Sequence, residues 1–147
     1  MNTFENEASR PFLIITSESR QYLAETAKWG KFLAILGYIT VGLMALGGIV
    51  MITTLSHFDD LNPDFNMSWM GYLYLLIALF YYFPVRYLHR FSEKISKGIA
   101  SENVEEVTLG FENLKSLFKF MGIATIVIIS LYILMILGMI IFFAASV

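Results

Sequence analysis

The chain has 147 residues, of which 57% are hydrophobic and only 15% are charged. A soluble domain of this length carries about 25% charged residues, so the composition predicts a membrane protein made of one domain. The formal net charge of −2, without a basic tract, argues against a nucleic-acid partner, and the absence of cysteine excludes disulfides, thiolate nucleophiles and cysteine-ligated metal sites.

Three stretches without Lys, Arg, Asp or Glu predict three membrane-spanning helices. They are Phe32–Phe58, Phe65–Val85 and Phe120–Val147. Each is long enough to cross a hydrocarbon core of about 30 Å at about 1.5 Å per helical residue. The N-terminal arm, residues 1–16, precedes the first of them, and its apolar run Phe12–Ile15 is too short for the core of a signal peptide.

The helices are expected to extend beyond the membrane. Thr16 or Ser17 can cap the start of the first helix, and Pro84 is expected to bend the second where it leaves the bilayer. In chain order, the predicted helices and their spans are residues 17–55 with span 32–56, 68–97 with span 66–86, and 102–145 with span 120–143.

The last two helices are expected to form an αα-hairpin, because apolar residues recur at spacings of three and four on both sides of Gly98. Gly98 itself is typical of a helix C-cap, and Asn103 followed by Glu106 predicts a capping box for the next helix. The predicted fold is therefore all-α: an antiparallel bundle of three long helices that extends from the membrane into the cytoplasm.

The distribution of positive charge predicts the orientation. All Lys and Arg residues lie before the first span or between the second and the third. The segment between the first two spans carries Asp59, Asp60 and Asp64 instead. Because Lys and Arg stay on the cytoplasmic side, we expect a cytoplasmic N-terminus and a periplasmic C-terminus.

The first helix carries a row of mainly small residues at helical spacing, from Leu23 to Gly48. In lipid, small residues let two helices approach closely. We expect this row to face the second or third helix, with a second copy of the same helix as the alternative. The predicted helix-packing residues are Gly30, Ala34, Gly37, Ala45 and Gly48.

A basic face follows the second span. Arg86, His89 and Arg90 lie on one side of the helix, and Lys97 follows further along. We consider them candidate contacts for an anionic lipid headgroup or for a phosphate of a partner. The alternative is that these charges only set the topology, with a pair between His89 and Glu93 one turn apart.

The outer loop resembles half of a calcium-binding loop. Asp60, Asn62 and Asp64 have the spacing of its first ligands, but Phe65 stands where the turn requires glycine. We therefore expect a solvated turn and no metal site. No cofactor is expected either.

Apart from Arg86 at the end of the second, the spans contain no ionisable residue other than tyrosine, which argues against a proton-coupled transporter. The two histidines, His57 and His89, are expected on opposite sides of the membrane, so they cannot share a site. Because no catalytic constellation can be assembled from the remaining residues, we expect a protein without enzymatic activity.

Three segments resemble a known family: Glu25–Gly37, Tyr82–Ser92 and Asn113–Gly122. Together they are similar to a domain-of-unknown-function family of small bacterial integral membrane proteins with three transmembrane helices, found mainly in diderm bacteria. The resemblance covers about residues 12–140. It implies a bacterial inner-membrane location and supplies no catalytic residue.

The leading functional hypothesis is a scaffold or accessory subunit that acts through helix packing. Its expected partners are the lipid bilayer, including anionic lipid, and either itself or another membrane protein. One alternative is a membrane immunity factor that sequesters a toxin. The other is a homo-oligomeric channel with an uncharged pore. The candidate pore-lining residues of that channel are Thr40, Thr53, Thr54, Thr125 and Ser130.

Overall fold

The computed structural model describes residues 16–61 and 67–145, and in this part of the chain it is entirely helical apart from short connections. Its elements are α1 (Ser17–Leu61), α2 (Trp69–Ala100) and α3 (Val104–Ala145). The predicted all-α fold of three long helices is therefore confirmed. The apolar run Phe12–Ile15 lies outside the described residues.

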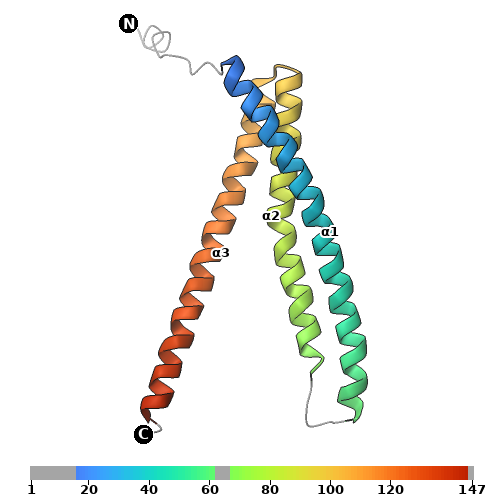
Figure 1. Ribbon diagram of the computed structural model, residues 1–147, viewed down its shortest axis with the longest axis vertical. Coiled ribbons are helices and arrows are strands. Elements are labelled where there is room, and N and C mark those ends of the chain that lie inside the picture. The colour runs from blue at the N-terminus through green and yellow to red at the C-terminus, as the bar shows by residue number, and fades with distance from the viewer. Residues whose placement is uncertain (1–15, 62–66, 146–147) are drawn as a thin grey trace, which may run out of the picture.

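The central helix is α2, which packs against both of the others. Figure 1 shows α1 and α2 running side by side, whereas α3 meets α2 only near their connecting turn and then diverges. The molecule has the shape of a V. We call the end that holds the α2–α3 turn and the start of α1 the vertex.

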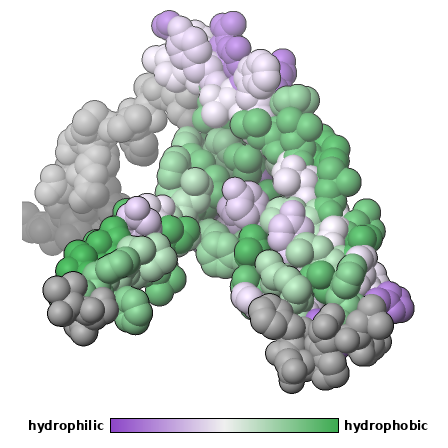
Figure 2. Space-filling view, turned by 60° about the horizontal axis from the view of Figure 1, so that its bottom comes forward, coloured by the Kyte–Doolittle hydropathy of each residue, from purple (hydrophilic) through white to green (hydrophobic). Residues whose placement is uncertain are grey.

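Each of the three helices is long and apolar enough to cross a membrane. Large apolar side chains face outward along the arms of the V, with Leu46 61% and Leu131 62% exposed. Figure 2 shows hydrophobic residues over both diverging arms, while hydrophilic residues gather mainly at the vertex. This distribution is the one expected of a membrane protein, because apolar surface is stable when lipid covers it.

The three helices share one small core near the vertex. Ala27 of α1 and Phe91 and Ile95 of α2 are almost completely buried there. Leu23, Leu88, Ile99, Val107 and Leu114 pack around them. We call this part the helical head: residues 17–31 of α1, 86–100 of α2 and 104–119 of α3. The apolar spacings of three and four on each helix produce this core.

The α2–α3 turn differs from the expectation at Gly98. This glycine is buried inside α2, where a Cβ atom would lie 2.8 Å from the backbone nitrogen of Val107. The helix ends later, and Glu102 takes the left-handed conformation with φ of 52°. Asn103 N donates to Gly98 O at 3.0 Å, which closes the end of α2 in the manner of a Schellman motif. Gly98 therefore serves close helix packing rather than the C-cap.

The caps at the two helix starts near the vertex follow the sequence in part. Thr16 Oγ1 accepts a hydrogen bond from Ser19 N at 3.2 Å at the start of α1. Asn103 Oδ1 accepts from the backbone nitrogens of Glu105 at 2.9 Å and Glu106 at 3.3 Å. The Glu106 side chain forms ion pairs with lysines of α2 instead of returning to Asn103, so the predicted capping box is only half formed.

Asp59 connects α1 to the start of α2 at the end of the helix pair that lies farthest from the vertex. The first helix continues to Leu61, past its expected end near residue 55. The Asp59 carboxylate accepts hydrogen bonds from Met67 N at 2.7 Å and Ser68 N at 3.0 Å, and from the hydroxyl of Ser68. Asp59 thus caps the start of α2 from the neighbouring helix, although we had expected it in a solvated turn.

Candidate functional site

The small-residue row of α1 faces α2. Gly30 packs against the side chain of Ser92, and Ala34 is completely buried. Ala45 is half-buried on the same side of the helix. Because an intramolecular neighbour covers these positions, they are not available to a second copy of α1.

Two further glycines of this row set the α1–α2 register. A Cβ atom on Gly37 would lie 2.6 Å from Val85 Cγ2, and one on Gly48 would lie 2.7 Å from Leu75 Cδ2. Real Cβ atoms do not approach other atoms so closely, so the helices can be this near only because these positions lack a side chain. Successive turns of α1 therefore meet successively earlier turns of α2.

The membrane half of α3, residues 121–144, is largely exposed in the described structure. From Met121 to Ala144 no residue is buried, and only Ala124 is half-buried. The last ring contact with α2 is made by Phe120, whose ring centroid lies 4.7 Å from that of Phe80 and 6.1 Å from that of Phe83. Beyond this aromatic cluster α3 diverges.

An apolar cleft of about 370 Å³ lies where α2 and α3 begin to separate. Pro84 and Leu88 line it from α2, and Leu117 and Met121 line it from α3. The helix α2 is continuous through Pro84. Proline leaves the preceding turn without one backbone donor, and its ring here fills part of the cleft wall.

The hydroxyls proposed for a pore lining bind their own helices where the structure gives them a partner. Thr40 donates to Leu36 O at 3.0 Å, and Thr125 donates to Met121 O at 2.8 Å. Thr53 donates to its own helix in the same manner. Such back-bonding satisfies the hydroxyl donor, which lowers the cost of facing lipid.

The two lysines near the α2–α3 turn share one carboxylate. Glu106 Oε2 lies 2.8 Å from Lys94 Nζ, and Glu106 Oε1 lies 3.3 Å from Lys97 Nζ. The hydrogen bond from Lys94, supported by Lys97, lowers the pKa of the Glu106 carboxyl. Lys97, one of the predicted contact residues, is therefore already paired.

A second ion pair joins α1 to the turn. Arg20 Nη1 lies 2.8 Å from Glu102 Oε1, and this contact lowers the pKa of the Glu102 carboxyl. Both side chains are well exposed, so the pair contributes little to stability. It is nevertheless a direct contact between the start of α1 and the α2–α3 turn.

The other predicted contact residues have different surroundings. Neither Arg86 nor Arg90 forms an ion pair within the described residues. The expected pair between His89 and Glu93 is likewise absent from the described part of the chain, because the His89 ring packs edge-on against Tyr38 with centroids 5.6 Å apart. His89 Nδ1 is buried there without a hydrogen-bond partner among these residues.

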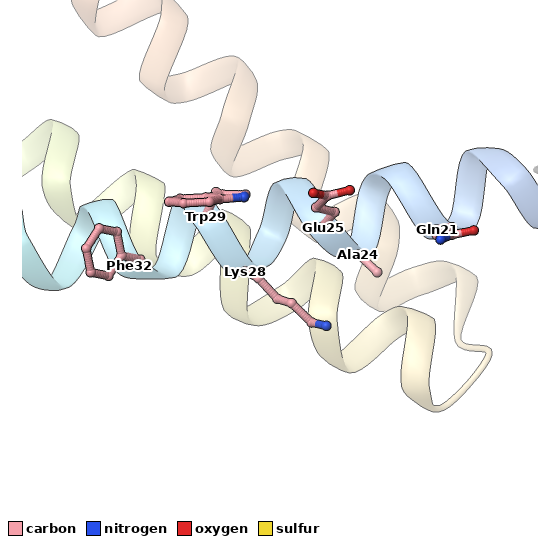
Figure 3. Close-up of a pocket in the computed structure, with 6 residues that line it drawn as sticks. All are labelled: Gln21, Ala24, Glu25, Lys28, Trp29 and Phe32. Carbon is pink, nitrogen blue, oxygen red and sulfur yellow. The ribbon is translucent and has the colours of Figure 1, made fainter.

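Two larger hollows lie at the surface of the helical head. One, of about 610 Å³, follows the outward side of α1 from Gln21 to Phe32. All of its lining residues come from this single helix, so it is an open groove (Figure 3). The other, of about 440 Å³, lies between Arg90 and Lys94 of α2 and Glu112 of α3. Neither hollow is an enclosed pocket.

No group of three His, Cys, Asp or Glu side chains able to hold a metal occurs in the parts that the structure describes. Asn62, Asp64 and the side chain of Asp60, which gave the calcium-loop pattern, lie outside those parts.

The fold and its surface define a class: an all-helical membrane protein with three candidate spans and a small helical head. No protein-family model, curated protein or solved structure matches the chain. The resemblance to the bacterial three-helix family therefore stays a prediction.

Proposed function

We propose that the protein is a non-enzymatic membrane scaffold or accessory subunit that binds another transmembrane helix through the membrane half of α3. It would lie in the bacterial inner membrane with its N-terminus and helical head in the cytoplasm. The observation that carries this proposal is the separation of α3: its last ring contact with α2 in the described structure is at Phe120, and no residue from 121 to 144 is buried.

The other two helices differ from α3 in how they use their small residues. The small-residue row of α1 is covered by α2, so it is not free to contact another helix. Gly122 and Gly138 of α3 have open space where a Cβ atom would be, as Gly42 of α1 does outside the row that packs on α2. Glycines in a membrane helix permit close approach of a neighbouring helix, which supports α3 as the element that binds a partner.

The charges support the proposed orientation. Every described Lys and Arg lies in the helical head. The outer end carries Asp59. An excess of positive charge on one side of a helical membrane protein marks the cytoplasmic side.

Site-specific photo-crosslinking in the native membrane tests the proposal. A photo-reactive amino acid replaces Leu131 on α3 or, as the control, Leu46 on α1. The two leucines are 62% and 61% exposed, so they present similar areas to their surroundings. We expect a discrete crosslinked protein from position 131 and none from position 46.

The mass of the crosslinked product distinguishes a second copy of the chain from a different protein. A product of twice the mass of the chain indicates self-association, and another discrete mass indicates a different subunit. The same pattern at both positions, or crosslinks to lipid alone at position 131, would overturn the proposal. Native mass spectrometry from nanodiscs provides the independent measurement of oligomeric state.

A further inference from the structure

The basic residues of α2 fall into two groups that the sequence alone does not separate. Lys94 and Lys97 share the carboxylate of Glu106. Arg86 and Arg90, which are nearer the membrane, have no carboxylate within ion-pair distance in the described part of the chain. Two unpaired guanidinium groups one helical turn apart are suited to a single phosphate, because each can donate parallel hydrogen bonds to its oxygens.

The α1–α2 register places these arginines at the inner edge of the membrane. Gly37 is level with Val85 and Gly30 is level with Ser92. Arg86 is therefore level with Leu36, inside the expected span 32–56, and Arg90 is level with Phe32 at its edge. A charge at this depth is stable when it extends to the headgroup region or binds an anion there.

Polar groups of the neighbouring helix converge on the same place. Tyr38 of α1 lies beside this part of α2, because its ring packs against Tyr82 and His89, which lie on either side of Arg86 along the helix. His89 lies between the two arginines along α2, and its Nδ1 is buried and unpartnered within the described residues. Tyr82, whose ring centroid lies 6.1 Å from that of Tyr38, adds a second hydroxyl one turn before Arg86.

We propose that Arg86 and Arg90, with Tyr38 and His89, bind the phosphate of an anionic phospholipid in the cytoplasmic leaflet. The acyl chains would lie along the apolar surface of α1 and α2 below the site. A phospholipid fits better than a soluble phosphate, because the register places Arg86 within the expected span, where a membrane-anchored anion is concentrated. The proposal uses the orientation given above but not the association of α3.

The chain offers a matched control on α3. Gly110 packs against Ile95, and Gly98 against Val107, so Lys115 and Lys119 are level with Arg90 and Arg86. These lysines also have no ion pair among the described residues, and they carry the same charge at the same depth. Both lysines are exposed, and neither lines the cleft between α2 and α3.

The experiment compares retained lipid after extraction from nanodiscs that contain phosphatidylglycerol and phosphatidylcholine, by native mass spectrometry. The test variant is Arg86→Gln/Arg90→Gln, and the control is Lys115→Gln/Lys119→Gln. We expect the preference of the test variant for phosphatidylglycerol to fall about tenfold, because the loss of charge-assisted hydrogen bonds has an effect of this size. The control should keep its preference. Circular dichroism verifies that both variants remain helical.

A third variant separates geometry from charge. Arg86→Lys/Arg90→Lys keeps both positive charges but cannot donate parallel hydrogen bonds, so its preference should fall between the other two. If Arg86→Gln/Arg90→Gln and Lys115→Gln/Lys119→Gln lose equal preference for phosphatidylglycerol, the protein has only a general belt of positive charge. If Arg86→Gln/Arg90→Gln loses no preference, the arginines do not bind the lipid. Displacement of the lipid by inorganic phosphate would assign the site to a soluble anion. Each of these outcomes overturns the proposal.

Discussion

Gly37 and Val85 lie so close that any side chain at position 37 would displace its neighbour: a Cβ atom there would be 2.6 Å from Val85 Cγ2. The contact lies in the middle of the α1–α2 interface. Lipid chains are as apolar as leucine, so the pairing of these helices depends on close packing rather than on a hydrophobic driving force. Loss of contact area here should weaken the pair directly.

Gly37→Leu should therefore separate α1 from α2, and the smaller change Gly37→Ala should destabilise the pair by about 1–3 kcal/mol through overpacking. Thermal unfolding in a fixed detergent measures the difference. Gly42→Ala is the control, because a Cβ atom at Gly42 meets nothing within 4 Å. Its stability should match that of the wild type or exceed it slightly, since alanine favours helix over glycine. Equal destabilisation by both alanine variants would contradict the packing argument.

Ile95→Ala should be the most disruptive truncation in the helical head. Ile95 is the largest fully buried apolar side chain in the described structure, and it also packs against Gly110 of α3. Removing its three carbon atoms leaves a cavity and should cost about 2–5 kcal/mol. The free energy of unfolding in detergent provides the measurement.

The matched truncation is Ile126→Ala on the membrane half of α3, where the side chain is 67% exposed. It creates no internal cavity, so the unfolding free energy of the isolated chain should change little. A cost at Ile126 equal to that at Ile95 would mean that α3 is buried within the single chain, against the observed divergence.

The sequence predicted the helices and the closed side of the bundle because both depend on local patterns. Uncharged stretches define the spans, and the spacing of Gly30, Gly37 and Gly48 defines one face of α1. The choice between an intramolecular neighbour and a second copy required the structure. A pattern of small residues states that a helix approaches closely, but it does not name the helix.

Long-range side-chain contacts could not be predicted from the sequence. The pairing of Glu106 with Lys94 and Lys97, in place of the expected capping box, depends on the register between α2 and α3. The same register places Gly98 against Val107, and α2 ends at Ala100, followed by Glu102, a residue type that rarely takes a left-handed conformation. The sequence also did not predict Asp59 as a cap, because its carboxylate accepts from backbone nitrogens at the start of a different helix.

Stability should fall in acid through Glu106. Lys94 and Lys97 hold the pKa of this carboxyl below its ordinary value of 4.5 in the folded protein. The folded state therefore resists protonation more than the unfolded state does. The stabilisation is fully present above pH 4.5 and is lost as the pH falls through the folded-state pKa.

Glu106→Gln should flatten this part of the profile. Thermal unfolding measured from neutral to acidic pH should show a smaller fall for the variant than for the wild type, although Glu102 retains some acid dependence through Arg20. Glu105→Gln controls for net charge, because Glu105 forms no ion pair in the described part of the chain. Parallel profiles for Glu106→Gln and the wild type would show that the two lysines do not act on this carboxylate.

Asp59→Ala should open the outer end of the α1–α2 pair. The carboxylate accepts hydrogen bonds from the backbone nitrogens of Met67 and Ser68, which precede α2 and have no acceptor of their own in the helix. Without it, both amides should exchange with solvent faster, and the first turn of α2 should fray. Hydrogen exchange followed by mass spectrometry on peptides from this region measures the effect. Ser56→Ala is the control.

The control is informative because Ser56 lies on the same last turns of α1 but donates only to Thr53 O of its own helix. Its loss should leave exchange at Met67 and Ser68 unchanged. Asp59→Asn keeps one oxygen acceptor and loses the charge, so its exchange rates should lie between those of the wild type and Asp59→Ala. If Asp59→Asn exchanges as slowly as the wild type, geometry alone closes the hairpin. If it exchanges as fast as Asp59→Ala, the negative charge at the helix start is the essential feature.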